Sequence, residues 1–448
     1  MDFFFYLFFE RLSRTGVNIE TDSEKKIRLK KVATATIVGS MLEWYDFYLY
    51  ATMASVVFAK VFFDTSNPEA ATIQAFATFA IGFVARPIGG LFFGYFGDKY
   101  GRKKMLFVTF LLMGICTTAI GFIPTYDTIG IWAPVFLVFF RIIQGLGAGA
   151  EFAGAAITSY EHASEEKRGS QGAWPALGLN LGLLLSSLTV FLLTLNGDEF
   201  LINGGWRIPF ILSFVLVFVG LWVRKSLPET PDYEKAEVEK IKTNPFKDIM
   251  KKNMKGLFVV FILAIGYNSL SYIFKTFSLA YLTQFQGISA HVTSLSVTIA
   301  SLVAICTVPL FGWLCDKWSS KKVLIAGGFL SMIFAYPFIK LLETGNHISI
   351  YVAVAIGTGV LAPMMFASQG SFLSRQFSVE NRSTGVSSGR ELGTALAGGL
   401  APLGALTLVA SSATNSTTGV IIILFIAAIL VVISAYFDQG HRFTKHKN

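Results

Sequence analysis

Residues 94–106 read GYFGDKYGRKKML, and residues 312–324 read GWLCDKWSSKKVL. The two stretches share Gly, Asp-Lys, Lys-Lys and Leu at matching positions, 218 residues apart. Each connects two apolar stretches that are long enough to cross a bilayer. A polar loop that recurs near half the length of the chain predicts two parallel copies of one larger membrane unit, which is a common design of transporters.

The composition of the 448-residue chain indicates a membrane protein, because 53% of its residues are hydrophobic and only 15% are charged. Soluble domains carry about 25% charged residues. Much of the surface of this chain must therefore face lipid. The net charge of +9 comes from basic residues in short segments between apolar stretches, so nucleic acid is not expected as a partner.

Twelve membrane spans are predicted from the apolar stretches, at residues 32–59, 70–97, 105–123, 131–157, 171–195, 206–223, 256–284, 291–314, 322–342, 348–373, 384–411 and 417–437. We therefore expect an all-α membrane protein with two pseudo-symmetric six-helix bundles around a central cavity. The predicted segments are a cytoplasmic N-terminal segment (1–31), an N-terminal bundle (32–223), a cytoplasmic linker (224–255), a C-terminal bundle (256–437) and a short cytoplasmic tail (438–448).

The distribution of basic residues supports this topology. If both termini are cytoplasmic, 30 of the 37 Lys and Arg residues lie on the cytoplasmic side, as the positive-inside rule requires. A second, weaker repeat also supports the two halves, because Ser164, Glu166 and Arg168 recur 214 residues later as Ser378, Glu380 and Arg382. We expect a multi-pass protein of the plasma membrane that acts as a monomer.

Two rows of small residues with a four-residue spacing predict close helix packing. They are Gly145/Gly149/Ala153 and Gly385/Gly389/Gly393/Ala397. The sequence contains no metal-ligand cluster, nucleophile motif or nucleotide-binding loop in a fitting context, so no cofactor is expected.

The repeated loop resembles the signature of the major facilitator superfamily, in which Gly-Asp-x-x-Gly-Arg precedes two basic residues, here at residues 97–104. Within that superfamily the chain is similar to the metabolite:proton symporter branch, which includes proline/betaine, citrate, α-ketoglutarate and shikimate transporters. The matching stretches are EWYDFY (43–48), RPIGG (86–90), RIIQG (141–145), GAE (149–151), GWRIP (205–209) and LPETP (227–231). The resemblance implies proton-coupled transport by alternating access.

The chain departs from this family pattern in three places. Ala150 stands where a second glycine is frequent. Ser319-Ser320 replaces Gly101-Arg102 in the second loop, which predicts a weaker second gate. Arg390-Glu391 stands where the family often has Tyr-Asn, which leaves the identity of the substrate open.

Eight ionisable residues are predicted to lie well inside the spans: the acids Glu43, Asp46, Glu151 and Glu391, and the bases Arg86, Arg141, Lys275 and Arg390. A charge at the bilayer centre costs roughly 2.5–3.5 kcal/mol, so these residues must pair or face a water-filled cavity. The set is formally neutral. Protonation of one carboxylate would leave one positive charge, which favours an anionic substrate and makes proton and anion binding mutually reinforcing.

Asp46 is the first candidate for the proton-coupling carboxylate. Glu43 lies three residues earlier on the same helical face and is the second, and Glu151 is the third. The resemblance implies a coupling role for Arg141. The alternative for each carboxylate is a structural ion pair that carries no proton.

The candidate substrate contacts are Arg86, Lys275, Arg390, Glu391, Tyr45 and Tyr48. Structural pairing is the alternative for the charged residues, and packing is the alternative for the tyrosines. Arg390 and Glu391 are neighbours in the chain, so they point in different directions and need not pair with each other.

Four residues of the repeated loops are predicted to form gates: Asp98, Gly101, Arg102 and Asp316. Their charges would pair between helices when the cytoplasmic side is closed. The alternative is a plain positively charged loop, which would need neither the Gly101 turn nor the Asp98 carboxylate.

These observations predict a proton-driven symporter of a small organic anion, such as a mono- or dicarboxylate. Within the same class, a zwitterion such as proline or betaine is the alternative substrate. An integral membrane enzyme, a channel and a sensor are alternatives of other classes. They are disfavoured because the chain offers no catalytic constellation and no soluble domain, whereas it carries a repeat with two gate loops.

Overall fold

The computed structural model describes residues 22–64, 66, 68–194, 198–225, 227–230, 249–251, 253–288, 290–412 and 416–440. The first 21 residues of the predicted N-terminal segment, residues 231–248 of the predicted linker and the tail beyond residue 440 lie outside these ranges.

The first half of the chain forms six long helices or helical runs. They are α2 (Asp22–Met53) continued by η1 (Ala54–Phe58) and α3 (Ala59–Val61), α4 (Pro68–Tyr100), α5 (Arg102–Ile120), α7 (Trp132–His162), α9 (Trp174–Thr194) and α11 (Arg207–Lys225). Short elements connect them: α6 (Tyr126–Ile129), η2 (Glu165–Lys167), α8 (Arg168–Gly172), α10 (Asp198–Phe200) and η3 (Leu201–Gly205).

The second half repeats this pattern. Its runs are α14 (Met254–Tyr272) with η4 (Ile273–Phe277) and α15 (Ser278–Gln284), α16 (Ala290–Trp318), α17 (Ser320–Glu343), α18 (His347–Ile356) with η5 (Gly357–Leu361) and α19 (Ala362–Ser374), α20 (Arg382–Ser411) after the short η6 (Val379–Asn381), and α21 (Thr418–Tyr436). Each of the twelve predicted spans coincides with one of these runs.

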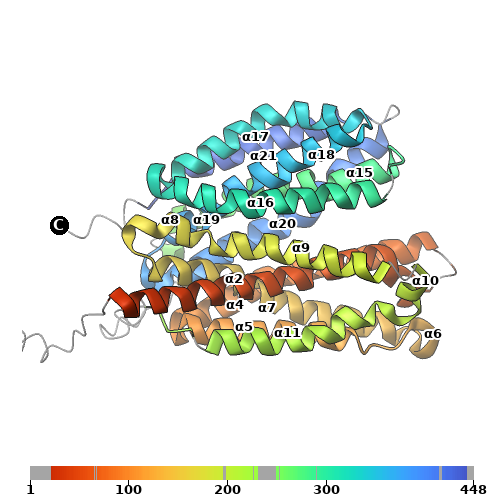
Figure 1. Cartoon of the computed structure of the whole chain (residues 1–448), viewed down its shortest axis with the longest axis horizontal. Helices are drawn as coiled ribbons and strands as arrows, with labels where there is room; N and C mark the ends of the chain where they lie inside the picture. Colours follow the sequence, from red (N-terminus) through yellow and green to blue (C-terminus); the bar gives the residue numbers. More distant parts are fainter. Residues whose placement is uncertain are drawn as a thin grey trace, which may run out of the picture.

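Eleven helices of the described residues are long and apolar enough to cross a membrane. The run that does not qualify is α2, although it extends along the whole bundle beside α9 (Figure 1). The charged residues at the start of α2, together with Glu43 and Asp46, lower its mean hydropathy. The predicted first span is present as a helix.

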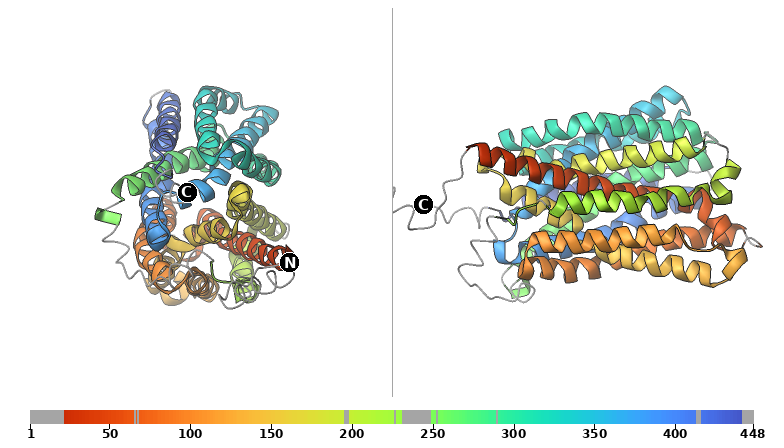
Figure 2. Two further views of the ribbon diagram at one scale, coloured as in Figure 1. Left: turned by 90° about the vertical axis from the view of Figure 1, so that its left-hand side faces the viewer. Right: turned by 60° about the horizontal axis from the view of Figure 1, so that its bottom comes forward.

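The two halves form two layers of helices (Figure 1). In one layer α2 packs against α9 and α11, and α7 packs against α4 and α5. In the other, α14 packs against α20 and α21, and α17 packs against α21. The layers meet where α20 contacts α4, α16 contacts α9 and α19 contacts α7. The start of α2 and the end of α21 lie at the same end of the molecule (Figure 2).

Small residues allow the closest helix contacts, as predicted. A Cβ atom at Gly149 of α7 would lie 2.2 Å from the carbonyl oxygen of Arg86, and one at Gly145 would lie 2.4 Å from that of Gly82. Gly393 of α20 faces α14 in the same way, because its Cβ would lie 2.6 Å from the carbonyl oxygen of Phe261. These helices could not approach so closely with larger side chains.

Replacement of Gly393 by alanine is expected to destabilise the protein by about 1–3 kcal/mol, because α14 would have to move away from the added methyl group. Gly404→Ala on the same helix is the matched control, since nothing lies within 4 Å of its added Cβ. Thermal unfolding of the purified protein in detergent measures the effect of each substitution on stability. An unchanged midpoint for Gly393→Ala would contradict the close packing.

Candidate transport site and gates

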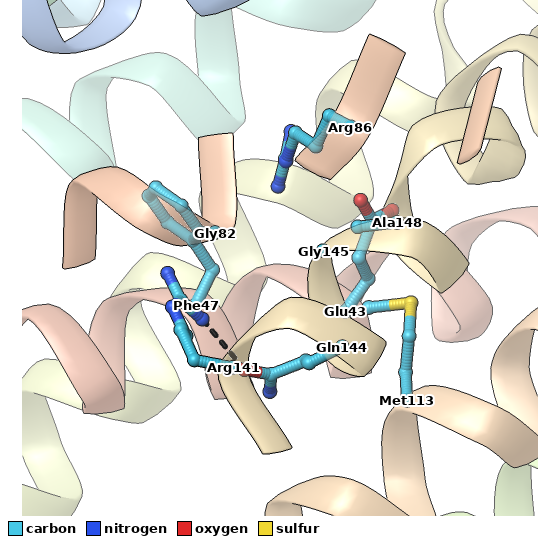
Figure 3. A pocket seen from close by; sticks show the side chains of 9 residues that line it. All are labelled: Glu43, Phe47, Gly82, Arg86, Met113, Arg141, Gln144, Gly145 and Ala148. Carbon is cyan, nitrogen blue, oxygen red and sulfur yellow. Dashed lines mark hydrogen bonds between the residues drawn. The ribbon is translucent and has the colours of Figure 1, made fainter. Parts of the chain in front are cut away.

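A small polar cavity lies inside the N-terminal bundle. It is lined by Glu43 and Phe47 of α2, Gly82 and Arg86 of α4, Met113 of α5, and Arg141, Gln144, Gly145 and Ala148 of α7. Figure 3 shows the side chains of Glu43, Arg86 and Arg141 converging on it. Its free volume of about 10 Å³ has room for one water molecule. An organic substrate does not fit in a space of this size.

Glu43 lies in this cavity without a hydrogen-bonding partner. Its side chain is 2% exposed, and neither carboxylate oxygen accepts a hydrogen bond. The charged groups that interact with it are Glu151, Arg86, Arg390 and Glu391. A buried carboxylate that lacks hydrogen bonds is costly in its ionised form.

Asp46 points toward α5 and α11 rather than into the cavity. Its two carboxylate oxygens accept hydrogen bonds from Thr117 (3.0 Å) and Ser213 (3.1 Å). The Thr117 hydroxyl accepts a bond from Gln144 Nε2 (2.7 Å), and Gln144 Oε1 accepts one from Arg141 (2.6 Å). A chain of three hydrogen bonds thus connects Asp46 with Arg141 in the cavity.

Arg141 is held mainly by aromatic rings. Its guanidinium lies 4.1 Å from the ring centre of Tyr50 and 5.4 Å from that of Phe79, and its hydrogen bond to Gln144 is the dashed line in Figure 3. The side chain is 3% exposed, and its Nε atom donates no hydrogen bond. Cation–π contacts stabilise a desolvated guanidinium by about 2 kcal/mol, but they do not neutralise its charge.

Glu151 is placed differently from Glu43. It forms a buried ion pair with Arg224 at the end of α11, and it accepts a hydrogen bond from Thr109 (2.8 Å). Arg224 also donates to the carbonyl oxygen of Leu106 (2.5 Å). The pair joins α5, α7 and α11 within one bundle. Arg224 could not be recognised as a partner of Glu151 from the sequence, because it stands at the start of the long polar linker.

A second group of charges lies between the bundles. Arg86 of α4 approaches Glu391 of α20 to 3.8 Å, and Arg390 pairs with the same carboxylate. Arg390 and Glu391 thus pair in the structure, although neighbouring residues of a helix point in different directions. Arg390 turns back along α20, and its guanidinium lies 4.0 Å from the ring centre of Phe152 in the other bundle.

Lys275 also crosses the interface. It lies in η4, where the helix is a π-helix, and its ammonium donates a 2.5 Å hydrogen bond to the hydroxyl of Tyr48. Tyr45 is not part of this group, because it packs in a separate apolar cluster with Leu49 and Tyr50. The structure thus brings Tyr48, but not Tyr45, together with a candidate substrate residue.

Aromatic residues that the sequence analysis did not select surround the charged groups. Phe366 stacks on Phe152 and on Tyr267, with ring centres 4.9 Å and 5.2 Å apart. Tyr272 packs against Phe83 at 5.9 Å, and it interacts electrostatically with Arg86, Arg390 and Glu391. These residues could not be singled out from the sequence, since aromatic residues make up 15% of the chain.

The first predicted gate is closed by Asp98. Its carboxylate accepts hydrogen bonds from the backbone amides of Ser383 (3.0 Å) and Thr384 (2.7 Å), and from the Thr384 hydroxyl (2.7 Å). These groups lie in the first turn of α20, where the helix dipole favours a negative charge. Arg102 is 3.2 Å from the same carboxylate. Asp98 therefore joins the two bundles.

The second gate mirrors the first. Asp316 accepts hydrogen bonds from the amides of Gly169 (2.6 Å) and Ser170 (3.2 Å) and from the Ser170 hydroxyl (2.5 Å), in the first turn of α8. The two contacts are related by the repeats seen in the sequence. Ser320 stands where the first gate has Arg102, so the second carboxylate lacks the neighbouring guanidinium.

The backbone at both loops has the conformation that the Gly101 turn predicts. Gly101 has a φ of 103°, and Ser319 has a φ of 99°. Ser319 is the sole non-glycine residue with positive φ in the described part of the chain. Such a conformation costs a non-glycine residue about 1–3 kcal/mol, which is a second physical reason for a weaker second gate.

The first gate also contains a carboxylate that the sequence analysis missed. Glu161 lies 2.6 Å from Arg382 and 3.7 Å from Arg102, and it is 5% exposed. The predicted fourth span ended at residue 157, whereas α7 continues to His162. The predicted span ended about one turn too early, and Glu161 was therefore left outside it.

No group of three or more His, Cys, Asp or Glu side chains in the described ranges could hold a metal ion. The site therefore consists of buried carboxylates and cations with aromatic neighbours, closed at one end by two helix-capping aspartates.

Comparison with known proteins places this arrangement in a family. The family described as "Sugar (and other) transporter" matches residues 32–255, and the one described as "Major Facilitator Superfamily" matches residues 271–447. The chain is 38% identical to the inner membrane metabolite transport protein YhjE of Escherichia coli over 83% of this chain and 86% of the relative.

Two further E. coli relatives differ in the substrates that their names state. The shikimate transporter is 34% identical (87% of this chain, 90% of the relative), and the proline/betaine transporter is 33% identical (86% and 79%). A solved structure of the proton:xylose symporter XylE has the same fold, with a TM-score of 0.73 at 17% identity, over 92% of this chain and 95% of that one.

Removal of the first gate carboxylate by Asp98→Ala is expected to shift the closed-to-open ratio at that end by about tenfold or more, since it deletes several charge-assisted hydrogen bonds. Spin labels at Lys104 and Lys322, two exposed residues at the starts of α5 and α17, report the separation in a Cys306→Ser background. Asp127→Ala, in exposed α6, is the control. Unchanged label distances in Asp98→Ala would refute the gate.

Proposed function

Because the chain belongs to the major facilitator superfamily and is a multi-pass membrane transporter, we propose that it carries a small organic anion together with protons by alternating access. We place it in the inner membrane, as the name of its relative YhjE suggests, with both termini in the cytoplasm. It acts as a monomer. The bundles then span residues 32–223 and 256–437, and segments 1–31, 224–255 and 438–448 are cytoplasmic. Membership in a transporter family excludes the membrane-enzyme alternative.

The balance of buried charge supports an anionic substrate, and it is the observation that carries the proposal. Glu151 and Arg224 neutralise each other away from the cavity. The remaining acids are Glu43, Asp46 and Glu391, and the remaining bases are Arg86, Arg141, Lys275 and Arg390. The site therefore has one excess positive charge before any proton binds. A carboxylate of the substrate would compensate it, and a proton would increase the attraction.

Glu43 and Asp46 are the proposed coupling carboxylates, and their surroundings suggest different roles. Glu43 lies in the cavity without a hydrogen bond, so it is placed to exchange a proton with solvent when that cavity opens. Asp46 has two hydroxyl donors and communicates with Arg141 through Thr117 and Gln144. Glu151 is assigned a structural role because its ion pair and hydrogen bond lie within one bundle.

The substrate is proposed to bind at the bundle interface. Arg86, Arg390 and Lys275 provide the positive charges, and Tyr48 provides a hydroxyl. Tyr45 contributes through packing alone. Alternating access follows from the gates, because Asp98 and Asp316 close one end with contacts that can break while each bundle stays intact.

A zwitterion such as proline or betaine is the second candidate. It is favoured by the identity of 33% to the proline/betaine transporter. The carboxylate of a zwitterion could use the same arginines, and its ammonium group would face Glu43. The buried positive charge of Arg390 disfavours it, because a zwitterion adds no net negative charge.

Uptake into proteoliposomes with an inside-alkaline pH gradient tests the proposed substrate class. The panel is labelled shikimate, citrate, α-ketoglutarate, proline and betaine. We expect accumulation of a carboxylate that collapses when a protonophore is added. Accumulation of proline or betaine would favour the second candidate. Equilibration of the substrate without dependence on the pH gradient would exclude proton coupling.

Glu43→Gln and Asp46→Asn are each expected to abolish pH-driven accumulation of that carboxylate, because neither variant can carry the coupled proton or pass its effect to Arg141. Both are expected to retain counterflow exchange, which needs no net proton movement. Glu165→Gln is the control, since the Glu165 side chain is 72% exposed. Full accumulation by either buried variant would exclude that residue from coupling.

A further inference from the structure

Glu391 occupies a position that suits a carboxylate from outside the protein. It lies between two arginines, with Arg86 of the other bundle at 3.8 Å and Arg390 in a direct ion pair. The three side chains are at least nine-tenths buried, at 1%, 4% and 2% exposure. Two guanidinium groups that converge on one buried carboxylate form an anion-binding site, which Glu391 fills in this form of the protein.

The contacts of Glu391 leave binding capacity unused. Oxygen Oε2 of Glu391 and Nε of Arg390 have no hydrogen-bond partner. The Arg86 contact of 3.8 Å is longer than a hydrogen bond. The guanidinium of Arg86 is otherwise surrounded by the rings of Trp44, Phe47 and Phe83, at 5.9, 5.2 and 5.2 Å. A mobile carboxylate could therefore satisfy these arginines better than Glu391 does.

We propose that Glu391 is an internal substitute for the carboxylate of the substrate. It compensates Arg86 and Arg390 when the carrier is empty, and the carboxylate of the substrate displaces it. This inference rests on the proposed function, since it requires an anionic substrate. Only part of the population has the arginines free, so the apparent affinity of the substrate is reduced by the fraction in which Glu391 occupies the site.

The same competition would couple the proton to the substrate. The charged and titratable groups that face Glu391 are Arg86 on α4, Arg390 on α20, Glu43 on α2 and Tyr272 on α14. Protonation of Glu391 removes the internal anion and frees both arginines for the substrate.

The cross-bundle contact also explains how a proton leak would be suppressed. The empty carrier closes with Glu391 ionised between the arginines, and the loaded carrier closes with the substrate in that place. A carrier with a proton on Glu391 but no substrate leaves two buried guanidinium groups without a counter-ion. Closure of that form is disfavoured, because an unpaired buried charge is strongly destabilising.

Binding of labelled shikimate to the purified full-length chain in nanodiscs at pH 8 tests the inference with the variant E391Q. We expect E391Q to bind shikimate at least about tenfold more tightly than the wild type, in line with the coupling energies of close charge pairs. Glu165→Gln is the control and should match the wild type.

The outcomes separate this inference from the proposed function. If the wild type binds shikimate and folded E391Q binds it equally or more weakly, Glu391 is not a competitor, and only this inference fails. If both proteins bind proline or betaine and no carboxylate, the proposed function fails and the inference fails with it.

Two additional measurements keep the inference testable. If E391Q does not fold, E391D is used instead. Its shorter carboxylate reaches Arg86 less well, so a smaller gain in shikimate affinity is expected. The absence of any gain overturns the inference. If neither protein binds a ligand of the panel, the distance between spin labels at Lys104 and Lys322 tests the inference. Ligand-free E391Q should populate a longer separation than the wild type, and identical distributions overturn the inference.

Discussion

Each charge that would be costly in the bilayer must be compensated by other groups of the protein. The arrangement of the helices reflects these compensating contacts. Glu151 and Arg224 compensate each other within one bundle, where they connect three helices. Arg86, Arg390 and Glu391 compensate each other across the interface. Glu43, in contrast, lies in the small cavity without a hydrogen-bonding partner.

The position of a compensating pair separates rigid parts of the molecule from parts that can move. Pairs and glycine contacts within a bundle have no reason to break during transport. The polar contacts between the bundles include three that end on a carboxylate. Asp98 and Asp316 each cap the first turn of a helix in the opposite bundle, and Glu391 joins the centre. Alternating access needs this combination of stable bundles and replaceable cross-links.

The helices could be predicted from the sequence, because hydropathy and the internal repeat depend on local pattern. The hydrogen-bond and ion-pair partners of the buried charged residues depend on tertiary packing and could not be predicted from the sequence. Asp46 and Glu43 share a helix face, yet only the structure shows that Glu43 lines the cavity while Asp46 contacts Thr117 and Ser213. The Arg390–Glu391 pair was missed because adjacent residues diverge along a helix until the long arginine side chain turns back.

Proton flux driven by the substrate is the measurement to make on this protein. Proteoliposomes that enclose a pH-sensitive dye are given an inward gradient of the carboxylate that the transporter accepts, with protein-free vesicles as the reference. Symport predicts that the lumen acidifies as the carboxylate enters, and that the Glu43→Gln variant loses this acidification. Entry of the carboxylate without acidification beyond the protein-free reference would contradict proton coupling.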